Sequence, residues 1–240
     1  FEGTNSLHSR GDRQETFDYT VYAGVKPWSG AEIWINPEID QGFGLAGTFG
    51  AAGFPSAEAY NVGKPDPYLK LQKLFIRQTI ALCGETEHLD PDLNVLAGHR
   101  THDRLVHTLG KFGVTDVFDT NAYAHDARND FLNWTVVDAG AFDYAADAWG
   151  YSAGAAVELY KGRYAVRAGL FDLSKIPNGE AIETGFRQYQ AVGEFEEHHT
   201  LFSHAGKVTL NGWFSHANMG RYTDAVARAV TQAAIDEGVA

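Results

Sequence analysis

Two carboxylates that could act as an acid–base pair lie on one face of a segment between residues 31 and 40. The even positions of this segment are polar or aromatic: Glu32, Trp34, Asn36, Glu38 and Asp40. A pair of carboxylates about 5–10 Å apart is the apparatus of a glycoside hydrolase. Glu32 and Glu38 would lie about 20 Å apart on an extended strand at about 3.3 Å per residue. This pair is therefore excluded as a hydrolytic site, whereas Asp138 and Asp143 form a second pair that the sequence alone does not position.

Histidines at ligand-like spacings are the next candidates for chemistry. They are His99 and His102, and His198, His199 and His204. These residues fall in predicted turns among acidic and polar neighbours, so we expect surface histidines and no transition-metal site. No loop motif marks a calcium site, and no nucleophile elbow or phosphate-binding loop is present. We expect no cofactor and no catalytic residues.

The composition narrows the class of protein. The 240 residues carry a net charge of −12, which argues against nucleic acid as a partner. No stretch approaches the roughly 18 apolar residues of a membrane helix. Membrane β-strands remain possible, because about ten alternating residues suffice for each. The 26 glycines and 13% aromatic residues suit many strands and turns.

Alternation of apolar and polar residues recurs in eight segments and predicts as many strands. The segments are residues 16–26, 31–40, 69–82, 104–112, 149–159, 163–170, 186–197 and 207–215. Short connections alternate with long ones, which is the pattern of outer-membrane barrels, although the connection at about 83–103 is longer than this alternation predicts and that after the sixth segment is intermediate. Residues after Met219 change to helical spacing and predict a short helix. Because a soluble β-sandwich shows the same alternation with its faces reversed, periodicity alone leaves both classes open.

Four groups of sequence strings carry a resemblance to a known family. They are WSGAEIWINPEIDQGFGL at 28–45, GFPS at 53–56 with LFIRQT at 74–79, GKF at 110–112 with FDTN at 118–121 and DFLNW at 130–134, and GAFDYAADAWGY at 140–151. In this order they resemble the carbohydrate-selective porins of the OprB family. The resemblance extends over about residues 13–222.

This resemblance implies a transmembrane antiparallel β-barrel of the outer-membrane porin type, which passes sugars by passive diffusion. About eight strands are half of the sixteen that such a barrel has, so we expect residues 1–240 to be one barrel domain that is incomplete at its C-terminus. The implied partners are mono- or oligosaccharides, outer-membrane lipid and a homotrimer. The alternatives are a soluble or surface carbohydrate-binding β-domain and, less favoured, a saccharide hydrolase.

A sugar offers many hydroxyls and one apolar face per ring, so a selective pore should present donors, acceptors and aromatic rings. We expect the lumen to be lined by Glu32, Trp34, Asn36, Glu38, Asp40, Arg77, Lys111 and Arg167. We expect a constriction within residues 115–147, formed by Asp119, Asn121, Asp130, Asn133, Trp134 and Asp143, with a short helix at 131–139 folded into the pore. The alternative for this segment is an extracellular loop that packs on the rim. Residues 41–64 are a second candidate for the same role.

Overall fold

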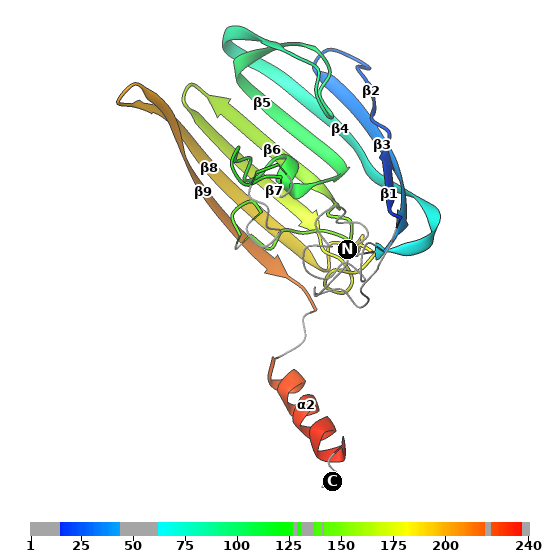
Figure 1. Ribbon diagram of the computed structural model, residues 1–240. Coiled ribbons are helices and arrows are strands. Elements are labelled where there is room, and N and C mark those ends of the chain that lie inside the picture. Colours follow the sequence, from blue (N-terminus) through cyan, green and yellow to red (C-terminus); the bar gives the residue numbers. More distant parts are fainter. Residues whose placement is uncertain are drawn as a thin grey trace, which may run out of the picture.

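A single antiparallel sheet organises the chain. The computed structural model describes residues 15–43, 62–126, 129–130, 137–140, 142–218 and 222–236. Within them the strands are β1 (Phe17–Thr20), β2 (Ala23–Val25), β3 (Ala31–Gly42), β4 (Lys64–Leu89), β5 (Gly98–Phe112), β6 (Ser152–Lys161), β7 (Tyr164–Asp172), β8 (Tyr189–Leu201) and β9 (His204–His216). The sheet order is β1-β3-β4-β5-β6-β7-β8-β9, with β2 also paired to β3. The sheet is curled into a trough (Figure 1), and the predicted all-β antiparallel fold is confirmed.

The two faces of the trough have opposite character. On β7, Ala165, Arg167 and Phe171 are buried on the concave face, whereas Val166 and Leu170 are exposed on the convex face. The same alternation of buried polar and exposed apolar residues runs along β3 and β8. Successive strand residues point to opposite faces, so this pattern follows directly from the period-2 sequence.

The connections differ between the two rims. In an up-and-down sheet, alternate connections lie at the same rim. The turns β6–β7 and β8–β9 each contain two residues, and the first has Gly162 at φ +56°, as tight hairpins require. The connections at the other rim are long: residues 43–63, 113–151 and 173–188. These two rims are called the turn rim and the loop rim below.

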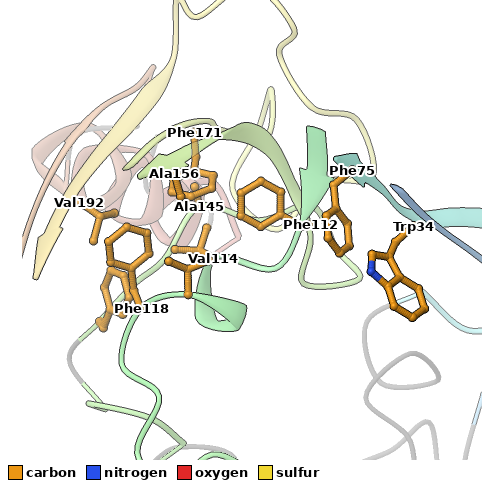
Figure 2. Packing of buried hydrophobic residues seen from close by; sticks show 11 residues of the cluster. Trp34, Phe75, Phe112, Val114, Phe118, Ala145, Ala156, Phe171 and Val192 are labelled. Carbon is orange, nitrogen blue, oxygen red and sulfur yellow. The ribbon is translucent and has the colours of Figure 1, made fainter. Parts of the chain in front are cut away.

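An aromatic row crosses the concave face and forms the core. Trp34, Phe75, Phe112 and Phe171 come from β3, β4, β5 and β7 and lie in a line (Figure 2). The Phe75–Phe112 and Phe112–Phe171 ring centroids are 6.0 and 5.4 Å apart. The connection 113–151 covers this row with residues that include Val114, the first residue of the 3₁₀ helix η3 (Val114–Asp116), and Phe118. The core therefore lies between the sheet and a long connection folded onto it (Figure 1).

Several element boundaries differ from the prediction. The first segment forms two short strands, because residues 21–22 interrupt the assigned strand between β1 and β2. Trp149 and Tyr151 precede β6, and Trp149 is buried against Tyr68, so it does not continue the exposed face of that strand. The predicted helix is present as α2 (Tyr222–Asp236). Among the described residues no helix is long and apolar enough to span a membrane.

Candidate functional site

Polar side chains on β3 and β4 line one wall of the trough. Glu38 accepts hydrogen bonds from Thr20 Oγ1 at 2.5 Å and from Gln72 Nε2 at 2.8 Å. Asp40 is buried two residues further on, and the register places it opposite Tyr68. Gln72 is the residue of β4 skipped by a register shift, which directs its amide to the concave face. These groups place carboxylates and amides where a soluble sandwich would have aliphatic core.

Glu32 and Arg77, both predicted to line the lumen, lie together on this wall. The two residues face each other in register, and Arg77 Nη1 lies 3.4 Å from Glu32 Oε2. Arg77 Nη1 also donates to the carbonyl of Asn94 at 3.0 Å. Asn36 and Asn94 exchange two amide hydrogen bonds of 3.1 and 2.9 Å. Trp34 is buried beside them and its indole N–H donates to Glu32.

A charged cluster around Arg167 forms the facing wall. Arg167 Nη1 lies 2.5 Å from Glu194 Oε1 and 3.3 Å from Glu196 Oε2, and its Nε lies 3.6 Å from Glu158 Oε2. The side chains of Arg167, Glu194 and Glu196 are at most 4% exposed. Burial makes an unpaired charge costly, so the three glutamates fix the guanidinium in place. Lys207 Nζ adds a second cation, 3.0 Å from Glu196.

The connection 113–151 is hydrogen-bonded to this second wall. The N–H of Asp119 donates to Glu194 Oε2 at 2.6 Å, and Lys207 Nζ donates to the carbonyl of Thr120 at 3.1 Å. Gln190 Nε2 donates to the carbonyl of Asp143 at 2.7 Å, while the side chain of Asp143 is exposed. The connection therefore lies inside the trough, attached at several points to β8 and β9.

Acidic side chains and an amide shape the described part of this connection. Asn121 Oδ1 accepts the N–H groups of Tyr123 and Ala124 at 3.1 and 2.8 Å. Asp130 Oδ2 accepts the N–H of His125 at 3.1 Å and closes a similar turn. Asp119, at φ +55°, accepts the N–H of Ala139.

Two side chains in the connection, those of His125 and Asp119, have raised pKa values. His125 Nδ1 lies 2.6 Å from Asp138 Oδ1, and this hydrogen bond raises the pKa of His125 above its usual value. Burial raises the pKa of Asp119, because removal from water disfavours the carboxylate. The connection thus contains one histidine and one aspartate whose pKa values are both raised above the ordinary values of these residues.

Lysines and aromatic rings meet at the loop rim. Lys111 Nζ lies 2.8 Å from Asp147 Oδ2, whose side chain is 1% exposed. Lys111 is paired in register with Leu74, which is exposed on the convex face. The side chain of Lys111 therefore starts on the convex face, and only its ammonium group reaches the connection. Lys70 Nζ lies 3.8 Å above the ring of Trp149, whose indole donates to Tyr68. The assignment of Lys111 to the lumen stays a prediction.

The structure gathers many of the predicted residues but not all. Glu32, Trp34, Asn36, Glu38, Asp40, Arg77 and Arg167 share the concave face, and Asp119, Asn121, Asp130 and Asp143 belong to the infolded connection. Asn133 and Trp134 lie outside the described residues, as do most of the predicted helix at 131–139 and most of residues 41–64. Residues 137–139 form bends and turns.

Other residues of the site were not singled out from the sequence. Glu194 and Glu196 alternate with apolar neighbours on β8, so their common face was visible in the sequence. The pairing of Asn94 with Asn36, across 58 residues, left no local signal. Within the described residues no group of three or more histidine, cysteine, aspartate or glutamate side chains could hold a metal ion.

The arrangement as a whole is a polar concave surface that is crossed by an aromatic row and narrowed by an infolded segment. Residues 4–239 match the profile of a protein family described as carbohydrate-selective porin, OprB family. No curated protein and no solved structure gives a significant match to the chain.

Proposed function

Because the chain belongs to the carbohydrate-selective porin family OprB, we propose that sugars diffuse passively along its concave face, through the water-filled lumen of an outer-membrane β-barrel. Membership of this family is the ground for the class of solute, carbohydrates, and for the membrane, the outer membrane. The route along the concave face is our own inference from the placement of the polar residues.

The observation that carries this proposal is the reversal of the two faces of the sheet. Charged and amide side chains such as Glu38 and Glu194 are buried on the concave face, whereas Ile35, Val166 and Leu210 are exposed on the convex face. A soluble sheet exposes its polar face to water, but a membrane barrel turns its apolar face to lipid and its polar face to the lumen. The runner-up, a soluble carbohydrate-binding domain, gives no reason for an exposed apolar convex face.

Lipid and further strands are the partners that follow from this arrangement. Among the described residues the sheet has edges at β1, β2 and β9. Backbone groups at such edges cannot stay unpaired in hydrocarbon. We therefore propose that additional strands of one barrel domain pair with these edges and that lipid covers the convex face. Membership of the porin family is the ground for our further proposal that three copies associate in the outer membrane.

Transport in this proposal is passive and needs no catalysis. Of the carboxylates considered for a hydrolase, Glu38 accepts hydrogen bonds from Thr20 and Gln72, and Asp138 pairs with His125. A series of sites that bind sugars weakly, through hydroxyl-binding groups and aromatic faces, would let sugars both enter and leave the pore, as conduction requires.

Reconstitution of the full-length protein in planar lipid bilayers tests the proposal. Open channels whose ionic current is reduced by added sugar would support a sugar-permeable pore. A protein that stays soluble without detergent and never conducts would overturn it and favour the soluble sugar-binding domain. Release of smaller saccharides from an oligosaccharide would instead indicate a hydrolase.

A matched pair of tyrosines locates the route. Thr20 donates to Glu38, and the register against β3 runs on unshifted from Thr20–Glu38 to Ala23–Ile35. Tyr22 therefore lies opposite Asn36, on the concave face. Tyr19 is exposed on the convex face, three residues away. We expect Tyr22→Ala to weaken the block by sugar several-fold and Tyr19→Ala to leave it unchanged. Equal effects of the two variants would contradict a route along the concave face.

A further inference from the structure

The hairpin of β4 and β5 extends beyond its neighbours at the turn rim. The pairing of β3 with β4 ends at Ala31 and Gln78, and that of β5 with β6 ends at Arg104 and Tyr160. From there β4 continues to Leu89, and β5 starts at Gly98. This part of the hairpin therefore projects past the sheet on both sides.

Two irregularities bend the projecting hairpin. Register shifts occur between Ala81 and Cys83 and between Cys83 and Thr86, and Gly84 lies between them at φ +96°. Such bulges bend the strand that contains them. A straight β4 would carry Leu89 about 40 Å from Arg77, at about 3.3 Å per residue. The carbonyl of Asn94 nevertheless lies 3.0 Å from Arg77 Nη1, so the hairpin folds back over the rim (Figure 1).

The connection at the tip of this hairpin, residues 90–97, is called the turn-rim flap. Asp92 and Val95 close its turn with two backbone hydrogen bonds of 3.1 and 3.0 Å, and Asn94 has φ +55°. The Leu96 side chain packs against the cluster that contains Trp34 and Phe75. The flap therefore brings an apolar contact as well as polar groups onto the concave face.

Hydrogen bonds hold the flap against β3 and β4. Asn94 is 6% exposed and Asn36 is 1% exposed, and their amides donate to each other. The N–H of Leu96 donates to Glu32 at 3.4 Å, and Lys26 Nζ donates to the carbonyl of Ala97 at 2.7 Å. Several independent contacts thus fix the flap in the inward position.

We propose that the turn-rim flap is a second segment that constricts the lumen, and that it enters from the rim opposite to that of the infolded connection 113–151. The two segments flank β5, before Gly98 and after Phe112, so they enter the trough from opposite rims. Both pack on the cluster that contains Trp34, Phe75 and Phe112, so they narrow the same part of the concave face. The inference rests on the proposed pore function. Sugars would pass between the two segments, and the wall at the flap presents the amide, guanidinium and carboxylate groups of Asn94, Arg77 and Glu32.

The position of the flap can be tested without any measurement of transport. In the full-length protein with Cys83→Ser, the pair Asn36→Cys and Asn94→Cys should form an intramolecular disulfide on mild oxidation, seen as a change in non-reduced gel mobility. The control pair, Asn36→Cys with Leu93→Cys, places the second thiol on an exposed neighbour. Efficient crosslinking of the first pair alone is the expected result, whereas no crosslink would overturn the inward position.

The effect on the passage is tested by removal of the flap. Replacement of residues 91–96 by Asn-Gly should increase single-channel conductance at least twofold and admit larger oligosaccharides in liposome-swelling assays. The matched control replaces Phe202 and Ser203, a turn at the same rim, with the same dipeptide and should change neither. Unchanged conductance in the deletion variant would overturn the proposal, even if the crosslink forms.

A second variant covers the case in which the deletion does not fold. In the Cys83→Ser background, a bulky membrane-impermeant thiol reagent attached to Asn94→Cys should reduce the current, and should react faster from the turn-rim side than from the loop-rim side. Reaction without any change in current would overturn the constriction. If the double-cysteine variant forms the crosslink but the wild-type protein never conducts, the proposed pore is contradicted and the inward position of the flap still holds.

Discussion

The backbone N–H of Asp119 lies 2.6 Å from Glu194 Oε2, while the other oxygen of Glu194 lies 2.5 Å from Arg167. One carboxylate thus joins the infolded connection to the charged wall of the sheet. A hydrogen bond with an ionised partner is roughly twice as strong as a neutral one. The position of the connection therefore depends on charges on β7 and β8 as well as on the apolar packing of Val114 and Phe118.

Substitution of Glu194 should loosen the connection. Glu194→Ala removes the acceptor of the Asp119 N–H and one partner of Arg167, which keeps Glu196 and Glu158. Loss of hydrogen bonds to a buried charge costs about 1.5–3 kcal/mol. We expect lower unfolding stability of the refolded protein in urea, and larger current fluctuations in open channels.

Glu197→Ala is the matched control for this prediction. Glu197 follows on the same strand but belongs to the opposite face, where it pairs with Arg163 at 3.4 Å. Such exposed pairs contribute about 0–1 kcal/mol. Equal effects of the two variants would mean that Glu194 has no special role in holding the connection.

The internal structure of the connection should also depend on pH through His125, because its partner Asp138 lies in the same connection. Its pKa is raised because the imidazolium is hydrogen-bonded to Asp138, with Asp116 and Asp119 adding to the attraction. The stabilisation is fully present below the ordinary histidine pKa of about 6.5 and is lost as the pH rises through the raised pKa. Current fluctuations of the wild type should therefore be larger at a pH above the raised pKa of His125 than at about pH 6.

His125→Gln tests the origin of this pH dependence, because glutamine keeps a polar side chain that does not titrate. The fluctuations of this variant should be the same at both pH values. An unchanged pH profile would assign the effect to other groups.

Phe171 should be the most sensitive position of the aromatic row. Its ring is fully buried and contacts Phe112 and Phe118, at centroid distances of 5.4 and 6.0 Å. Phe171→Ala should lower stability by about 3–5 kcal/mol, because the cavity left behind adds to the lost burial. Val166→Ala, on the convex face of the same strand, should cost much less. The temperature at which the folded gel mobility is lost would compare the two variants.

The parts of this structure that alternation encodes were predictable from the sequence. The even residues of β3 share a face because strand side chains alternate, and the register could be inferred from the short turns. Contacts across long separations in the chain were not predictable. The reach of Asn94 to Asn36 depends on two bulges in β4, and the attachment of Asp119 to Glu194 spans 75 residues. Neither bulges nor such pairings leave a periodic signal.

Charge placed on either face of one strand gives the most direct test of the face assignment. Leu210 is exposed on the convex face of β9, whereas Thr209 precedes it on the concave face, between Lys207 and Asn211. Leu210→Arg should cost about 2–4 kcal/mol near the centre of the bilayer and reduce assembly into outer membranes. Thr209→Arg adds the same charge to the polar face, where lumen water and Glu196, its register neighbour, can accept it. We expect this variant to assemble normally and to conduct fewer cations. If Leu210→Arg instead assembled as well as Thr209→Arg, the convex face could not be in contact with lipid.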